Sequence, residues 1–202
     1  MIGVQKRGVK FHEVFMEIPE WEEIAIPEGF GPYRLLYNPP SETVIAELRS
    51  IGEQFLPNQL YIRQKDAPRY EPVNALEPMV SSESPVTSLQ RPLLFYLSNR
   101  VTKGEGQGWS GDWEGLYSFD LRTRTRLKFA DKDALRLPPP YVKGWVTNLV
   151  DVSADASELY LTIGMMPPDS KSGFRMANYQ LARMDLPNGQ IHLVSHLKGS
   201  FF

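Results

Sequence analysis

Acidic and aromatic residues alternate with glycine in one stretch of the chain, GQGWSGDWEGLYSFDL, residues 106–121. Asp112 and Glu114 flank Trp113. Paired carboxylates beside aromatic rings are the groups that glycoside hydrolases use to protonate the leaving group and to act as base or nucleophile. Carboxylates two residues apart are also common in ordinary loops, so the pattern favours sugar binding over catalysis and a plain loop over both. No catalytic residue is predicted.

Two further motifs in the chain have the spacing of a cofactor or metal site. Gly106, Gly108 and Gly111 form G-x-G-x-x-G, but a dinucleotide site needs a helix after the glycines to receive the pyrophosphate. The following GLYSFDL alternates like a strand. His192 and His196 would share one face of a helix, whereas on the strand predicted here they lie about 13 Å apart, too far for one metal ion. We expect neither a cofactor nor a metal.

Four cations alternate along RTRTRLKF: Arg122, Arg124, Arg126 and Lys128. In an extended chain they share one face. Such a row can bind phosphate or an acidic partner. It can also keep an edge strand from pairing with other chains. The pattern favours the edge strand.

The composition is that of an ordinary globular chain of 202 residues, with 42% hydrophobic and 23% charged residues. The net charge of −2 gives no basic field for nucleic acid, and the absence of cysteine excludes disulfides and thiolate chemistry. The apolar runs are too short to span a membrane. No apolar segment follows the charged N-terminus, so we expect a cytoplasmic protein, or a periplasmic or secreted one from which a signal was removed.

Most segments are short, rich in β-branched or aromatic residues, and separated by Pro, Gly, Asn and Ser, which predicts an all-β fold. Three pairs of segments keep one constant offset along the chain: LLFYLS at Leu94 with LYLTIG at Leu159, LYSFDL at Leu116 with LARMDL at Leu181, and RLKF at Arg126 with IHLV at Ile191. A constant offset indicates a duplicated unit. In the second unit Asn188-Gly189 predicts a tight hairpin turn.

Each unit is predicted to contain four antiparallel strands, within one β-rich domain over 1–202. The repeats occupy 78–137 and 138–202, and 1–77 is an irregular region with a weak third copy. There YRLLYNPPSETVIAEL would supply the last two strands of a unit. The run 41–55 is compatible with a helix, although it favours a strand followed by a short helix or turn.

In the ungapped alignment of the two clear repeats, His192 faces Leu127 and Leu193 faces Lys128. A leucine opposite a lysine conflicts with the expected alternation of buried and exposed positions. We therefore expect a slip of the last strand at one of the two turns.

The stretch LLFYLSNR…GLYSFDLRTRTRLKFA resembles a blade of the TolB-like or WD-repeat-like β-propellers. DVSADASELYLTIG is similar to their Ser-Pro-Asp-Gly corner, here Ser153-Ala154-Asp155-Ala156, with alanine in place of proline and glycine. The resemblance implies four-stranded antiparallel blades in a partial or oligomer-completed β-propeller, and a role in protein–protein interaction. A β-sandwich is the alternative fold. Too few blades to close a ring leave open sheet edges, which a protein partner or a second copy would cover.

Both repeats carry their extra length between the second and third strands, at 99–114 and 164–178, and the connection 130–145 is predicted to reach the same face. Elaborated loops on a rigid scaffold often carry binding, although loops that only pack together are the alternative. Nine residues there are predicted to bind: Arg100, Trp109, Asp112, Trp113, Glu114, Tyr141, Trp145, Phe174 and Arg175. We expect a non-enzymatic protein-binding or scaffold module; the alternative is a carbohydrate-binding or glycan-processing protein that uses the loop 105–114.

Overall fold

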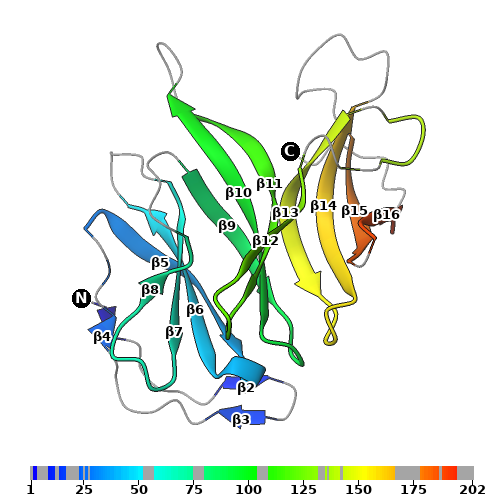
Figure 1. Ribbon diagram of the computed structural model, residues 1–202. Coiled ribbons are helices and arrows are strands. Elements are labelled where there is room, and N and C mark those ends of the chain that lie inside the picture. Colours follow the sequence, from blue (N-terminus) through cyan, green and yellow to red (C-terminus); the bar gives the residue numbers. More distant parts are fainter. Residues whose placement is uncertain are drawn as a thin grey trace.

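The computed structural model describes residues 2–3, 9–11, 14–16, 23–24, 26, 28–51, 57–74, 80–103, 109–131, 135, 137–141, 143–166, 178–186 and 188–194. Within these ranges the fold is all-β, with three four-stranded antiparallel sheets and two small two-stranded sheets (Figure 1). No helix in this part of the chain is long and apolar enough to cross a membrane.

We call the three large sheets blades 1, 2 and 3. Blade 1 contains β5 (Phe30–Asn38), β6 (Thr43–Ser50), β7 (Gln59–Gln64) and β8 (Glu71–Pro72), with the 3-10 helix η1 (Pro39–Ser41) between β5 and β6. Blade 2 contains β9 (Val80–Thr87), β10 (Leu93–Lys103), β11 (Trp109–Asp120) and β12 (Arg126–Ala130). Blade 3 contains β13 (Lys143–Val152), β14 (Glu158–Met166), β15 (Asn178–Asp185) and β16 (Gln190–Leu193). The small sheets pair β1 (Ile2–Gly3) with β4 (Glu23–Ile24) and β2 (Val9–Phe11) with β3 (Val14–Met16).

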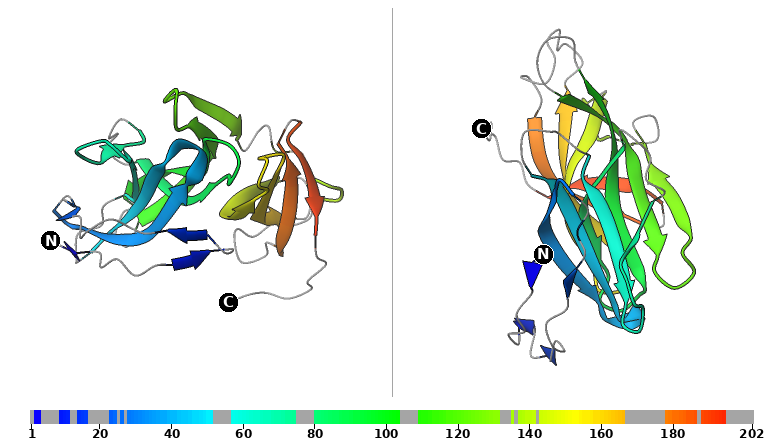
Figure 2. Two further views of the ribbon diagram at one scale, coloured as in Figure 1. Left: turned by 90° about the horizontal axis from the view of Figure 1, so that it is seen from below. Right: turned by 90° about the vertical axis from the view of Figure 1, so that its left-hand side faces the viewer.

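The blades fan out side by side in the order of the chain (Figure 2). In each blade the strands follow one another in sequence order, and the first strands β5, β9 and β13 contact one another from blade to blade. This is the strand order and packing of blades in a β-propeller, so the predicted fold class is confirmed.

Blade 2 is buried on both faces, which explains its continuous apolar run LLFYL. Leu94 and Tyr96 pack with blade 1 in a core that includes Ile45 and Ile62. Phe95 and Leu97 point the other way, into the larger core shared with blade 3. Successive side chains of a strand alternate between faces, so a strand with neighbours on both sides is apolar at every position.

We call the turn between the first and second strands of each blade its corner, and hydrogen bonds join the corners of neighbouring blades. Asn38 at corner 1 is fully buried. Its Oδ1 accepts hydrogen bonds from the backbone N–H and the hydroxyl of Ser41, at 3.0 and 2.6 Å. Its Nδ2 donates across to the carbonyl oxygens of Ser88 and Arg91 at corner 2, both at 2.8 Å. One amide therefore shapes its own turn and joins two blades.

Corner 2 repeats this arrangement toward blade 3. The Ser88 hydroxyl accepts from the backbone N–H groups of Gln90 and Arg91 within its own turn. It donates to the Ala154 carbonyl at corner 3, at 2.5 Å, and the Gln90 N–H donates to the same oxygen at 2.9 Å. A relay of hydrogen bonds thus runs from corner 1 through corner 2 to corner 3.

The constant offset between the repeats is confirmed through the last strand, and the expected slip is wrong. Tyr117 pairs with Lys128 in blade 2, and their counterparts Ala182 and Leu193 pair in blade 3. Lys128 lies on the face toward blade 1, just as Leu193 lies on the face toward blade 2. The conflict in the alignment arose because the position that faces the preceding blade carries an apolar side chain in blade 3, Leu193, and a cation in blade 2, Lys128.

Three local predictions can be compared with the structure. Blade 1 is a complete sheet, and the segments predicted as its last two strands are its first two, β5 and β6. The run 41–55 forms the predicted strand over Thr43–Ser50, and the one-turn helix η1 precedes it. The short helix or turn predicted to follow falls on residues 52–56, which lie outside the described part. The hairpin at Asn188-Gly189 is confirmed, with Gly189 at φ 68°.

Replacing Asn38 by Ala should lower the free energy of unfolding by about 2–3 kcal/mol, because the buried Ser88 carbonyl loses its donor and Ser41 loses its acceptor. Urea unfolding followed by circular dichroism measures this change. The control is Asn188→Ala, at an exposed asparagine that also accepts a turn hydrogen bond, from the Gln190 N–H at 2.8 Å. The control should cost less than about 1 kcal/mol. Equal losses for the two variants would contradict the role of the relay.

Candidate functional site

Much of the segment predicted as a long loop at 99–114 extends the β10–β11 hairpin. β10 continues to Lys103 and β11 begins at Trp109, and Gly111 lies within β11, paired with Val101. The expected strand after the glycines is therefore confirmed and replaces the helix that a dinucleotide site would need. The prediction of a loop over 99–114 is wrong for 99–103 and 109–114, because these residues lie in strands that pair with one another across the hairpin.

A β-bulge in this hairpin decides where the acidic and aromatic residues point. Ser98 pairs with Gly115, and the next residue of β10 pairs with Trp113, so Glu114 is the extra residue. A Cβ at Gly115 would lie 2.6 Å from the Ala130 carbonyl oxygen, so only glycine fits there. The bulge turns Glu114 toward blade 1, while Trp113 packs against the core between blades 2 and 3.

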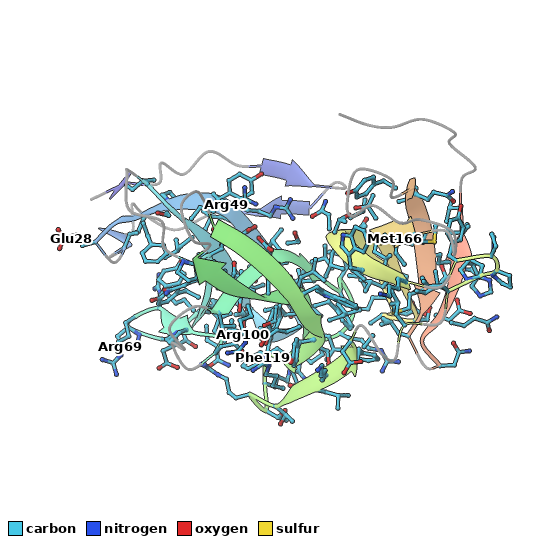
Figure 3. The ribbon with its side chains drawn as sticks, turned by 90° about the horizontal axis from the view of Figure 1, so that it is seen from above. Glu28, Arg49, Arg69, Arg100, Phe119 and Met166 are labelled. Atoms are coloured by element: carbon cyan, nitrogen blue, oxygen red, sulfur yellow. The ribbon has the colours of Figure 1, made fainter. Side chains whose placement is uncertain are left out.

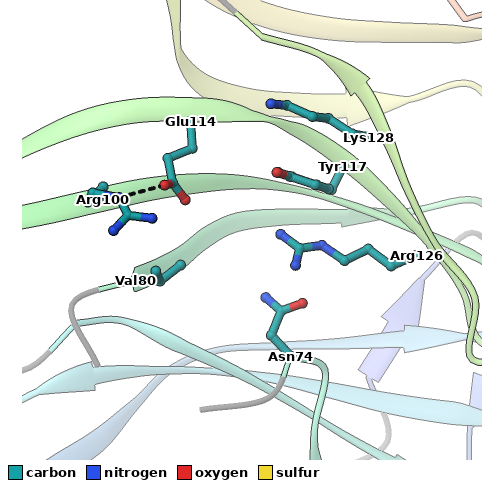
Figure 4. A pocket seen from close by; sticks show the side chains of 7 residues that line it. All are labelled: Asn74, Val80, Arg100, Glu114, Tyr117, Arg126 and Lys128. Carbon is teal, nitrogen blue, oxygen red and sulfur yellow. Dashed lines mark hydrogen bonds and ion pairs between the residues drawn. The ribbon is translucent and has the colours of Figure 1, made fainter. Parts of the chain in front are cut away.

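Glu114 lies in a polar pocket on the side of blade 2 that faces blade 1 (Figure 4). The pocket has a volume of about 240 Å³. Three cations, one carboxylate, a tyrosine, an amide and a valine line it: Arg100, Arg126, Lys128, Glu114, Tyr117, Asn74 and Val80. In Figure 4 the guanidinium groups of Arg100 and Arg126 point toward one another from opposite sides.

The three cations have different partners. Arg100 pairs with Glu114 at 2.8 Å. Lys128 pairs with Asp131 at 3.0 Å, and the hydrogen bond to that carboxylate raises the pKa of Lys128. Arg126 stacks on the ring of Tyr117, 3.8 Å from its centroid, and no carboxylate of the described residues lies within ion-pair distance. Within the described part of the chain, the pocket therefore contains one cation whose charge no carboxylate neutralises.

The inner wall of the pocket is fixed by hydrogen bonds. The buried Tyr96 hydroxyl donates to Asn74 Oδ1 at 2.8 Å, and Asn74 Nδ2 donates to the Ser82 hydroxyl at 2.7 Å. Burial raises the pKa of Tyr96 to about 12, against the opposing charge of Arg126. Both polar groups of Asn74 are thus engaged, which holds this wall rigid.

The prediction of a cation row on an edge strand holds only for Arg126 and Lys128, which lie on the edge strand β12 and face blade 1. It is wrong for Arg122 and Arg124, which lie in the turn before β12, where Arg124 adopts φ 60°. Arg122 Nη2 donates to the Pro40 carbonyl at 2.6 Å, and Arg124 pairs with Glu71 at 3.0 Å. Both contacts join blade 2 to blade 1. Only the second half of the row, Arg126 and Lys128, reaches the pocket.

The nine predicted binding residues do not meet on one surface. Arg100 and Glu114 lie together in the pocket. Trp113 and Tyr141 pack against the core between blades 2 and 3, and Trp145 lies on the opposite side of blade 3. Trp109 and Asp112 belong to β11, but their side chains are outside the described part, as are Phe174 and Arg175 altogether.

Trp145 belongs to a second candidate surface, the far face of blade 3, which points away from blade 2. Strand pairing places Trp145, Gly164 and Tyr179 side by side, and the two rings meet edge to face at 6.3 Å. A Cβ at Gly164 would lie 2.8 Å from the indole, so glycine makes room for the tryptophan. We define the far face by the half-buried side chains Trp145, Tyr160, Thr162, Tyr179, Leu181 and Arg183.

Ion pairs lie at one end of the far face, where β14 begins and β15 ends. Arg183 pairs with Glu158 at 3.2 Å and lies 3.4 Å from Asp185, whose other carboxylate oxygen is 3.1 Å from His192. The Tyr160 hydroxyl donates to Glu158 at 2.9 Å. The described residues contain no group of three or more His, Cys, Asp or Glu that could hold a metal ion.

Sequence reasoning missed Tyr160, Tyr179 and Arg183 as surface residues of interest. The signal was present, because Leu159, Leu161 and Ile163 are all fully buried in the core toward blade 2. Since side chains alternate along a strand, the intervening positions must face the other way.

The chain matches no known family model and no curated protein. Among solved β-propeller structures, it is similar to an oligogalacturonate lyase in complex with manganese, at 14% identity and a TM-score of 0.47, over 79% of this chain and 38% of that one. The oligogalacturonate lyase from Vibrio parahaemolyticus is 13% identical with a TM-score of 0.48, over 81% of this chain and 39% of that one. A xyloglucanase from Xanthomonas campestris is 8% identical with a TM-score of 0.48, over 82% of this chain and 22% of that one. The chain thus spans less than two fifths of each structure, and the likeness concerns the fold alone.

Tyr96→Phe should reduce the loss of stability in alkali. The pKa of Tyr96 rises from 10.0 to about 12 on folding, so the unfolded chain ionises first and the free energy of unfolding falls as pH rises from 10 to 12. This residue accounts for up to about 2 kcal/mol of that fall. The variant should lose about 1 kcal/mol at neutral pH with the Asn74 hydrogen bond, but show a shallower fall above about pH 10. Urea unfolding across this range is the test, and an unchanged slope would contradict the assignment.

Proposed function

We propose that the protein is a non-enzymatic protein-binding or scaffold module that binds its partner through the far face of blade 3. One observation carries the proposal: among the described residues, both faces of blade 2 contribute to a buried core, whereas in blade 3 only the face toward blade 2 does. On its first strand, Thr147, Asn148 and Asp151 are exposed, and Val150 is 50% exposed. A propeller blade ordinarily packs between two others, so this face is suited to a further sheet.

The composition of the far face supports a protein partner. Trp145, Tyr160, Tyr179 and Arg183 belong to the residue types that dominate binding energy in protein interfaces. Flat aromatic side chains bury much area at a small cost in side-chain entropy. Polar groups beside them, such as the Thr147 and Thr162 hydroxyls that bond to each other at 3.0 Å, give the mixed character of a non-obligate interface.

We also propose that the blades are of the TolB-like or WD-repeat-like kind. The support comes from corner 3, where Asp155 accepts hydrogen bonds from the hydroxyls of Ser153 and Ser157, both at 2.8 Å, and from the Ser157 N–H at 3.1 Å. These bonds hold a tight corner in which Ala156 adopts φ 58°. A glycine reaches this conformation without strain, so alanine here is a departure from the motif that the corner's hydrogen bonds offset.

The partner that the proposal favours supplies a β-sheet, either from a second copy of this chain or from a different chain. The glycan alternative has weaker support. Glu114 is held by Arg100, and Trp113 lies on the other side of the sheet, so these two residues do not form one sugar-binding surface.

Tyr160→Ala should weaken partner binding about tenfold or more, because it removes an aromatic ring from the middle strands of the far face. The protein purified from its source, analysed by native mass spectrometry, gives the mass of any bound chain and shows whether it is a second copy. The affinity for that chain is then measured for each variant.

The matched control is Tyr33→Ala, on β5 of blade 1, where the side chain is 54% exposed. It should leave partner binding within about twofold of the original. A chain that is monomeric and unaccompanied at its natural concentration would contradict the proposal. So would a partner that Tyr160→Ala retains and Tyr33→Ala loses.

A further inference from the structure

The repeat shows which side chains the fold itself requires at the positions of the pocket. By the constant offset between the repeats, Arg100, Arg126 and Lys128 of blade 2 correspond to Met165, Ile191 and Leu193 of blade 3. Met165 is fully buried, Ile191 is 6% exposed, and Leu193 packs against the same core. The three apolar side chains seal blade 3 onto blade 2.

At the junction of blades 1 and 2 the same positions are cationic and surround a pocket. Ser98, the counterpart of the buried Ile163, follows the same change from apolar to polar. Packing alone would be served by apolar side chains, since burying apolar surface is the main favourable contribution to folding. Polar residues at positions where the fold favours apolar ones are expected at functional sites.

The charges of the pocket do not cancel among the described residues. Arg100 is neutralised by Glu114 and Lys128 by Asp131. Arg126 has the ring of Tyr117 beneath it and that of Tyr96 at 6.0 Å, and no carboxylate of the described residues lies within ion-pair distance. Stacking on Tyr117 orients the planar guanidinium, which also interacts with the Tyr96 hydroxyl. Its remaining N–H donors are left for a ligand, and arginine binds planar anions with two parallel hydrogen bonds.

We propose that this pocket binds the carboxylate of a small organic acid, with Arg126 as its principal ligand and with Lys128 and Arg100 on either side. A singly charged carboxylate neutralises the one uncompensated cation. It also matches the fork of N–H donors on a guanidinium better than a spherical ion does.

The size of the pocket limits what it holds. Its volume of about 240 Å³ is below the range of about 300–1,000 Å³ of pockets for drug-sized molecules. The side chain of Arg100 is 58% exposed and that of Lys128 42%, so water and salt reach the charges. Binding is therefore weak and sensitive to ionic strength.

Titration of the ¹⁵N-labelled protein by NMR tests the proposal, with acetate and lactate as carboxylates and acetamide and lactamide as neutral analogues. We expect saturable shifts of the Arg126 and Tyr117 signals with the acids and none with the amides. Arg126→Gln should raise the dissociation constant about tenfold or more. Two further probes define the ligand: inorganic phosphate, and N-acetyl-aspartate amide, which stands for an acidic side chain of a protein.

Two more variants separate binding from folding. Arg69→Gln removes one positive charge from an exposed residue that points away from the protein body (Figure 3) and should leave the dissociation constant within about twofold. The double variant Arg126→Ile, Lys128→Leu installs the side chains of blade 3. It should fold with at least the stability of the original chain and lose the response to carboxylates.

The outcomes are distinct. Saturable binding that Arg126→Gln and the double variant abolish supports the site, whatever the result with Tyr160→Ala. Tighter binding of phosphate than of any carboxylate, or of N-acetyl-aspartate amide than of acetate and lactate, would overturn the assignment to a small organic acid. Shifts that sodium chloride reproduces, or that the double variant retains, would overturn the site itself.

Discussion

The buried amide of Asn38 is the contact on which the arrangement of the blades depends. Its side chain lies where the first two blades meet and bonds to both. A buried amide left without partners costs roughly 1–3 kcal/mol, so the two corners can adopt few relative positions that satisfy it. Ser88 transmits the same constraint to corner 3. Blade spacing is therefore fixed by directional bonds at one end of the sheets, and the apolar cores fill the space between them.

That constraint explains how blade 2 can replace apolar residues by cations at the other end. Corner 2 lies just before β10 begins, whereas Arg100 lies near the end of that strand. The core around Leu94, Tyr96 and Ile45 is next to the corner end of the strand. Because the relay and this core hold the two blades together, Arg100 and Arg126 are not needed for the seal that Met165 and Ile191 provide in blade 3. Contacts of Arg122 and Arg124 with blade 1 add to the junction without filling the pocket.

Much of the fold follows from the sequence, and the reasons are local. The run LLFYL, the hairpin at Asn188-Gly189 and the constant offset between the repeats each depend on neighbouring residues or on repetition, so pattern reading finds them. Which blade covers which face is not local. The alternation of Arg126 and Lys128 shows that they share a side, but only the packed structure shows that blade 1 lies there. Likewise, the bulge that separates Glu114 from Trp113 depends on the Ala130 carbonyl of a neighbouring strand, which no spacing along β11 reveals.

The pocket and the far face of blade 3 lie on opposite sides of two packed sheets. Between them is the core that contains Phe95, Leu97, Leu159 and Leu161, each at most 1% exposed. Packed interiors of this kind resist small displacements, and coupling between distant sites requires an element with two discrete arrangements. The side chains that form this core are apolar and alternate regularly along paired strands. Blade 2 and the core that it shares with blade 3 thus separate the two surfaces in space, and no element with two arrangements is seen between them among the described residues.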